Sequence, residues 1–196
     1  TDTFSDGVLD GWSVVNNSPL AGAWSVQNGR AFQANPVENT SARQGTYQLG
    51  TYAYLSGGTE LTDYRFSVTA QFVGSGLKED VGVAFRYVDD RNYYRLSLNS
   101  RHGYTRLEKR TGGQFSTLAV NSRGYRPGES LDIIVEVRGP KLYVWINGDP
   151  IFAVNMPRVG DVYDYNTINA IFEEYSKVPA KVAIELVGFM GAETAK

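Results

Sequence analysis

The stretch from residue 80 to residue 110 has the clearest alternation of hydrophobic and polar positions in the chain. Turn-forming residues divide it into three runs, and successive side chains of a strand point to opposite faces of a sheet. The pattern therefore predicts three consecutive antiparallel strands, over residues 81–87, 92–99 and 103–110. One face of this meander is apolar and is expected to pack inward.

The opposite face of the meander combines positive charge with aromatic rings. Alternation places on it, with Glu108, the side chains of Arg86, Arg95, Arg106, Tyr93 and Tyr104. Arginine binds carboxylates in a bidentate manner, and tyrosine can stack on sugar rings and hydrogen-bond their hydroxyls. This face is therefore predicted to bind an acidic, uronate-containing polysaccharide. The alternative is an ordinary exposed sheet whose arginines and Glu108 form cross-strand ion pairs.

The rest of the chain repeats short strands and tight turns. Residues 63–72 alternate cleanly, and Arg65 and Gln71 on their polar side would flank the binding face if this strand neighbours the meander. Asn28-Gly29 and Asn147-Gly148 predict tight hairpins. No segment keeps a helical period, and about a dozen short strands favour an all-β fold, an antiparallel β-sandwich of the jelly-roll type with two packed sheets. A single domain is expected over residues 1–196.

Composition excludes several classes of function. A formal net charge of -2 does not suggest a nucleic-acid partner, and no apolar run approaches the roughly 20 residues of a membrane span. Without cysteine there is no disulfide, thiolate metal site or cysteine nucleophile. Because Thr1 is not a natural start, we expect a piece of a longer protein, acting as a monomer or as part of a multidomain protein.

Aspartates are concentrated at the start of the chain. Asp2 and Asp6 lie with Asp10 among turn-forming glycines. Carboxylates at this density can ligate a hard cation, so a structural calcium ion bound by Asp2 and Asp6 is one prediction. The alternative is a turn-rich entry loop, in which Asp and Gly are common in any case.

Several motifs follow one another in an order typical of a known superfamily. They are Phe4-Ser5-Asp6-Gly7 before Gly11-Trp12, Trp24-Ser25-Val26 before Asn28-Gly29, Gly82-Val83-Ala84-Phe85-Arg86-Tyr87 before Asn92-Tyr93-Tyr94-Arg95, then Tyr125-Arg126-Pro127-Gly128 and residues 144–148. This order resembles the concanavalin A-like lectin/glucanase superfamily, and more narrowly the laminin-G-like carbohydrate-binding modules of secreted bacterial polysaccharide-active proteins. The resemblance implies a secreted, extracellular module that binds polysaccharide. The superfamily also contains hydrolases and lyases, so the fold does not assign an activity.

Catalysis is an open alternative. A lyase that breaks a uronate by β-elimination needs a base, an acid and a cation, and these groups could come from Tyr93, Tyr104, His102 and Arg95.

A glycoside hydrolase is less favoured than a lyase. It needs two carboxylates about 5–9.5 Å apart, whereas Asp132 and Glu136 would lie roughly 13 Å apart along one strand. The chain also lacks the Glu-x-Asp-x-x-Glu strand typical of the hydrolase members and the Gln-x-His motif typical of the alginate-lyase branch. An adhesion or scaffold domain without a glycan ligand is a further alternative.

Overall fold

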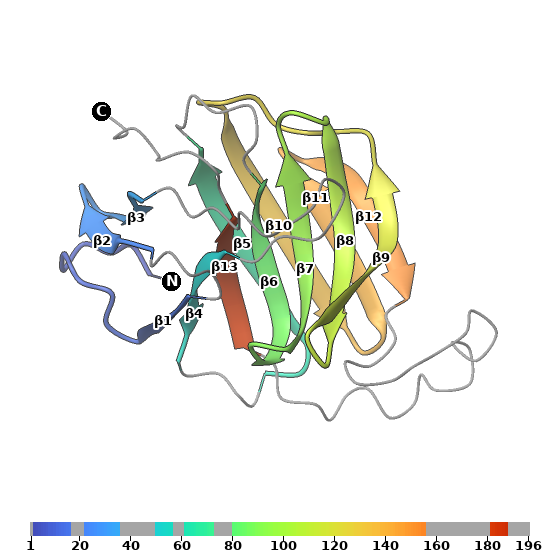
Figure 1. The fold of residues 1–196 in the computed structure, drawn as a ribbon, viewed down its shortest axis with the longest axis horizontal. Helices are drawn as coiled ribbons and strands as arrows, with labels where there is room; N and C mark the ends of the chain where they lie inside the picture. Colours follow the sequence, from blue (N-terminus) through green and yellow to red (C-terminus); the bar gives the residue numbers. More distant parts are fainter. Residues whose placement is uncertain are drawn as a thin grey trace.

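The computed structural model is built from short antiparallel strands (Figure 1). It describes residues 2–16, 22–35, 50–56, 61–72, 80–155 and 181–187, and for residues 80 and 181–187 it describes the backbone alone. The strands are β1 (Trp12–Asn16), β2 (Trp24–Gln27), β3 (Arg30–Gln33), β4 (Thr51–Leu55), β5 (Tyr64–Gln71), β6 (Asp80–Asp89), β7 (Asn92–Asn99), β8 (Tyr104–Thr111), β9 (Gln114–Asn121), β10 (Ser130–Arg138), β11 (Lys141–Ile146), β12 (Asp149–Asn155) and β13 (Lys181–Val187). Within these ranges no helix is long and apolar enough to cross a membrane.

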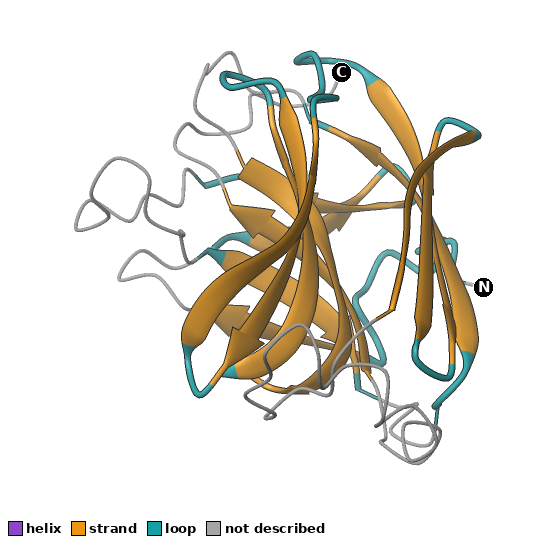
Figure 2. Ribbon diagram, turned by 90° about the vertical axis from the view of Figure 1, so that its right-hand side faces the viewer, coloured by secondary structure: helices purple, strands orange, loops and turns teal. Residues whose placement is uncertain are grey.

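Two sheets face each other (Figure 2). The larger has seven strands in the order β1-β4-β13-β6-β7-β8-β9, and the smaller has four in the order β12-β11-β10-β5. Strands β2 and β3 form a separate hairpin. The predicted antiparallel sandwich is confirmed, and the predicted meander forms β6, β7 and β8 of the larger sheet.

The main hydrophobic core lies between the two sheets. Side chains no more than 1% exposed come from both of them, namely Val83, Phe85, Leu96, Leu98 and Leu107 from the larger sheet and Ile133, Val135, Leu142 and Val144 from the smaller. Burying each such side chain stabilises the fold by about 1.5–3 kcal/mol. These core residues occupy alternate positions along each strand, as the sequence predicts, because one face of each sheet is buried against the other sheet.

Both Asn-Gly pairs form the hairpin turns expected from the sequence. The φ angles are 50° and 67° at Asn28 and Gly29, and 52° and 82° at Asn147 and Gly148. Positive φ at both central residues matches the right-handed twist of the flanking strands, and Asn and Gly tolerate it best. The Asn147 side chain also accepts a hydrogen bond from the backbone N–H of Asp132, which ties this turn to β10.

A β-bulge in β6 changes the side of the sheet on which two predicted residues lie. Arg86 has a φ of 46°, and the register between β6 and β7 shifts between Phe85 and Asp89. A bulge inserts one residue into a strand and so resets the alternation of its side chains. The placement of Arg86 beside Arg95 on one face was therefore wrong. Alternation from Val83 and Phe85 also predicts an inward Tyr87, and this is wrong too, because Tyr87 packs on the outer face of the larger sheet.

The outer face of the larger sheet has an apolar cluster of its own. Tyr52, Ala84, Tyr87 and Tyr93 are buried there, with Phe115 and other side chains packed against them. The hydroxyls of Tyr52 and Tyr87 are 2.7 Å apart, within hydrogen-bond distance. Part of the face predicted to be solvated is therefore a packed aromatic layer.

Candidate functional site

The predicted arginine face contains a nearly dry ion pair. Arg95 Nε donates a hydrogen bond to Glu108 Oε2 at 2.8 Å, and Arg95 Nη2 lies 2.7 Å from the same oxygen in an ion pair. The two side chains are 4% and 1% exposed, and the Arg95 guanidinium lies 4.2 Å from the Phe115 ring centroid. The cross-strand ion pair weighed as the alternative to ligand binding is therefore present at Arg95. This arginine is committed to a partner within the protein.

Tyr93 is also closed to solvent. Its side chain is 0% exposed, and its ring contacts the rings of Tyr52, Tyr87 and Phe115 at centroid distances of about 6 Å. The ring therefore packs in the aromatic layer and presents no open face on which a sugar could stack.

An accessible group lies where β7 turns into β8. We call His102, Tyr104 and Arg106 the Arg106 cluster. The Arg106 guanidinium carbon lies 3.7 Å from the Tyr104 ring centroid, and the His102 ring is within 8° of parallel to the Tyr104 ring at 6.3 Å. Arg106 Nη1 lies 3.7 Å from Glu108 Oε1, which is an ion-pair distance but too long for a hydrogen bond. The cluster combines an imidazole, a phenol and a guanidinium at the exposed end of the predicted face.

Three predicted residues lie elsewhere. The Arg86 guanidinium donates a hydrogen bond to the Gly139 carbonyl oxygen, and its backbone N–H donates one to the Tyr64 hydroxyl at 2.8 Å. Arg65 and Gln71 lie on β5, which pairs with β10 in the smaller sheet and does not neighbour the meander. The condition for their flanking role is therefore not met. Arg95, Arg106, Tyr93 and Tyr104 share the outer face of the larger sheet, without these three, and Tyr93 and Tyr104 lie at opposite ends of the β7–β8 pair.

The N-terminal aspartates support local structure. The two carboxylate oxygens of Asp2 accept hydrogen bonds from the Phe4 N–H at 2.8 Å and the Trp12 indole N–H at 2.6 Å. These two bonds, that from Phe4 first, lower the pKa of Asp2. Asp6 accepts a bond from the Val8 N–H at 3.2 Å. Among the described residues no group of three or more His, Cys, Asp or Glu side chains could hold a metal ion. Calcium binding by Asp2 and Asp6 stays a prediction.

The outer face of the smaller sheet carries an aromatic pair that was not predicted. Tyr143 and Trp145 on β11 have ring centroids 5.9 Å apart and planes within 24° of each other. The signal was present in the sequence, because Lys141, Tyr143 and Trp145 alternate with the buried Leu142, Val144 and Ile146. Aromatic rings on the face away from the core are candidates for binding rather than packing.

Tyr64 and Tyr87 both have a raised pKa. Burial raises the pKa of Tyr64 to about 12, although the bond from the Arg86 N–H acts in the opposite direction. Burial also raises the pKa of Tyr87 to about 12, against the effect of the hydrogen bond with Tyr52. Neither hydroxyl is therefore suited to act as a base near neutral pH.

The solved structures most useful for comparison are β-sandwich domains. Carbohydrate binding module CBM66 from Bacillus subtilis has a TM-score of 0.63 at 13% identity, over 95% of this chain and 91% of that one. The catalytic domain of an endo-1,3-beta-glucanase (laminarinase) from Thermotoga petrophila has a TM-score of 0.61 at 13% identity, over 96% and 85%. The resemblance to the concanavalin A-like superfamily is confirmed at the level of the fold.

Sequence comparison gives a relative and a family. An extracellular exo-alpha-L-arabinofuranosidase of Streptomyces chartreusis is 28% identical over 186 residues, which are 90% of this chain and 21% of that protein. The chain thus spans about a fifth of the length of this curated relative. The family model described as a 3-keto-alpha-glucoside-1,2-lyase-like domain matches residues 1–173. Since this match covers most of the 196 residues, the chain belongs to the family of 3-keto-alpha-glucoside-1,2-lyase-like domains.

Proposed function

We propose that this chain is a polysaccharide-binding module of a secreted protein and that it binds an acidic glycan at the Arg106 cluster. The observation that carries the proposal is the state of the Arg106 guanidinium. Its side chain is 27% exposed, it lies on the Tyr104 ring, and it makes no hydrogen bond to any residue that the structure describes. Its N–H donors are therefore available to a carboxylate.

The surroundings of Arg106 prepare it for such a ligand. The Tyr104 ring holds the guanidinium from one side, so less side-chain freedom is lost when a ligand binds. Glu108 is already paired with Arg95 at 2.7 Å, and so competes weakly for Arg106. The exposed His102 ring extends the surface formed by Tyr104. The arrangement fits a uronate whose carboxylate meets Arg106 while its ring lies along the cluster.

The comparisons support a glycan as the ligand. The family description names a glucoside, the curated relative is named as an arabinofuranosidase, and one structural neighbour is named as a carbohydrate binding module. The relative is also named as extracellular, which supports secretion. The acidic character of the ligand rests on the chemistry of Arg106 alone.

Calorimetric titration with polygalacturonate, alginate and hyaluronate tests the proposal. Arg106→Ala should weaken binding on the order of tenfold, as expected for one lost charge-assisted contact. Arg30→Ala is the matched control, because it removes the same charge from the separate β2–β3 hairpin. Equal affinity of the wild type and Arg106→Ala for every acidic polymer would remove Arg106 from the site.

A second candidate function is β-elimination. It is favoured by the family description, which names a lyase-like domain, and by the adjacent imidazole, phenol and guanidinium of the Arg106 cluster. In such a step a base removes the proton next to a carbonyl or carboxylate, a carbon–carbon double bond forms, and the glycosidic oxygen leaves with a proton from an acid. His102 and Tyr104 are the accessible groups for these roles, whereas Tyr93 is buried and Arg95 is paired with Glu108.

Ultraviolet absorbance separates the two functions. Elimination creates a conjugated double bond in the product of a uronate polymer or of a 3-keto-glucoside, so absorbance rises with time. A rise that is lost in His102→Gln would make the protein a lyase. A flat trace with both substrate classes, alongside an active control lyase, would leave the binding module as the function.

A further inference from the structure

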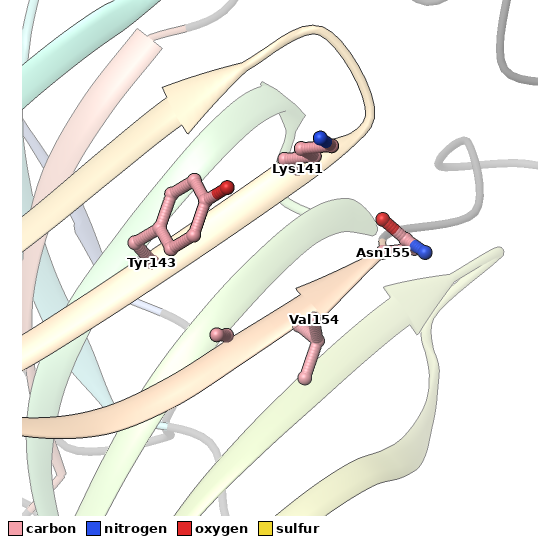
Figure 3. Close-up of a pocket in the computed structure, with 5 residues that line it drawn as sticks. Lys141, Tyr143, Val154 and Asn155 are labelled. Carbon is pink, nitrogen blue, oxygen red and sulfur yellow. The ribbon is translucent and has the colours of Figure 1, made fainter.

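The outer face of the smaller sheet presents an aromatic surface on the side of the sandwich away from the Arg106 cluster. Tyr143 pairs with Glu136 of β10 on one side and with Ala153 of β12 on the other. The Tyr143 ring lies over the strands with its face toward the viewer in Figure 3. Trp145 follows on the same face with its plane within 24° of the Tyr143 ring. Ala153, the β12 partner of Tyr143, has a small side chain and lines the same cavity as Tyr143.

A shallow cavity adjoins this ring. It has a volume of about 140 Å³ and is lined by Lys141, Tyr143, Ala153, Val154 and Asn155 (Figure 3). The Lys141 ammonium, the Tyr143 hydroxyl and the Asn155 side chain form no hydrogen bond with any residue that the structure describes. An aromatic ring bordered by donors and acceptors that no described residue engages is the chemistry that a pyranose needs, since a sugar has an apolar face and a rim of hydroxyls.

The charges around the ring favour an acidic ligand. Glu136 is bound by two arginines, with Arg65 Nη1 at 3.3 Å and Arg138 Nε at 2.5 Å from its oxygens. The Arg65 guanidinium also lies 5.7 Å from the Trp145 ring centroid. Lys141 forms no ion pair with a described residue, so it adds a positive group beside the Tyr143 ring. An anionic group of a ligand beside Tyr143 would form an ion pair with the Lys141 ammonium.

The same face is a poor fit to a protein partner. The large hydrophobic residues exposed in the described part of the chain are Val8, Val14, Leu61, Val88 and Val120, and none of them belongs to β10, β11 or β12. Protein interfaces have a buried apolar centre surrounded by a polar rim. Two rings among paired and unpaired polar groups provide no such centre.

We propose that Tyr143, Trp145 and Lys141 form a second glycan-binding surface, which takes one acidic pyranose of a polysaccharide with its ring face on Tyr143 and its carboxylate at Lys141. This surface is independent of the Arg106 cluster, because it lies on the other sheet. A module with binding surfaces on both sheets can hold two chains or two segments of one chain, which increases avidity without any new contact.

The test compares polygalacturonate with its fully methyl-esterified form, titrated into the full chain and followed by tryptophan emission and calorimetry. Trp145 lies next to Tyr143 and reports occupancy of this surface, so Trp145→Phe should abolish the emission change. Tyr143→Ala should weaken this binding on the order of tenfold. Lys141→Gln should weaken binding of the acid polymer and leave binding of the ester unchanged, whereas Lys141→Arg should retain both. Ser67→Ala, on the exposed side of β5, is the control.

The outcomes at the two surfaces are distinguishable. If Tyr143→Ala and Lys141→Gln bind acid polymers with wild-type affinity and stoichiometry, while Arg106→Ala does not, the second surface is excluded and the first stands. If Tyr143→Ala lowers affinity and Arg106→Ala does not, the second surface stands and the first is excluded. If Tyr143→Ala loses binding and also has a lowered melting temperature, unfolding could explain the loss. Lys141→Gln then decides, because it removes a charge without removing a ring from the sheet.

Discussion

Arg95 and Glu108 lie opposite each other on β7 and β8 and form a nearly dry ion pair on the outer face of the larger sheet. The Arg95 guanidinium lies over the Phe115 ring, and Arg106 Nη1 lies 3.7 Å from the other oxygen of Glu108. The carboxylate thus holds Arg95 and leaves Arg106 the more accessible of the two arginines. The division of roles between the two arginines follows from which of them Glu108 holds.

Removing one partner of this pair should destabilise the protein strongly. Arg95→Met removes the charge but keeps much of the volume, and leaves Glu108 buried with a distant partner. The free energy of unfolding should fall by about 3–5 kcal/mol, because an uncompensated charge remains in a dry site. Urea denaturation measures the loss. The double variant Arg95→Met with Glu108→Leu should recover part of the lost stability. If Arg95→Met alone were as stable as the wild type, the burial of this ion pair would be contradicted.

The Tyr64 hydroxyl should stabilise the bulge in β6. It accepts the backbone N–H of Arg86 at 2.8 Å, and Tyr64→Phe would leave this donor unsatisfied. The expected loss is about 1–3 kcal/mol in the free energy of unfolding. Tyr143→Phe is the matched control, because its hydroxyl has no partner among the described residues and its removal should change stability by about 0.5 kcal/mol or less. Equal effects of the two substitutions would show that the Arg86 N–H is satisfied in another way.

Alternation in the sequence predicted the faces of uninterrupted strands well. Tyr93 and Arg95 of β7 and Tyr104 and Arg106 of β8 share one face as expected, because each strand continues without a bulge up to these residues. The prediction for Arg86 was wrong because a bulge in β6 resets the alternation at this residue. Arg86 itself adopts the positive φ, so no glycine in the sequence marks the bulge.

The alternation of hydrophobic and polar residues does not predict which outer faces are covered or which strands pair. Alternation states which side chains share a face, but not whether that face is covered, so Tyr93 looked like a ligand contact and is 0% exposed. The pattern of β5 would fit either sheet, and its pairing with β10 is a contact between residues about 70 apart in the chain, such as Arg65 and Glu136. Tyr143 and Trp145 alternate with buried residues of β11, but alternation alone does not separate a binding face from an ordinary outer face.

Gly82 should be irreplaceable in β6. A Cβ atom at this position would lie 1.9 Å from the backbone carbonyl oxygen of Leu96, and a backbone atom cannot move aside as a side chain can. Gly82→Ala should therefore separate β6 from β7 locally and lower the free energy of unfolding by about 3 kcal/mol or more. Thermal denaturation followed by circular dichroism measures the effect, with Ser67→Ala as a surface control. A melting temperature unchanged by Gly82→Ala would contradict this close approach.

Calcium binding at the N-terminal aspartates has a direct test. If Asp2 and Asp6 ligate calcium, the melting temperature should fall in chelator and recover when calcium is added back, because a ligand of the folded state raises its stability. Asp6→Asn is the better variant, since Asp2 also holds the Trp12 indole at 2.6 Å. This variant should lose the response to calcium. No change of melting temperature in chelator would exclude a stabilising calcium ion.

The raised pKa values of Tyr64 and Tyr87 predict how the stability of the protein changes in alkali. In the unfolded chain a tyrosine has a pKa of about 10, whereas the pKa values of Tyr64 and Tyr87 in the folded protein are about 12. The folded state therefore binds more protons between these values, and the stability contributed by both phenols is complete below pH 10 and is lost as the pH rises toward 12. Tyrosinate absorbance should show two phenols that ionise later than the exposed ones. Tyr87→Phe should remove one of them and make stability less steeply dependent on pH above 10, and an unchanged slope would show that Tyr87 titrates normally.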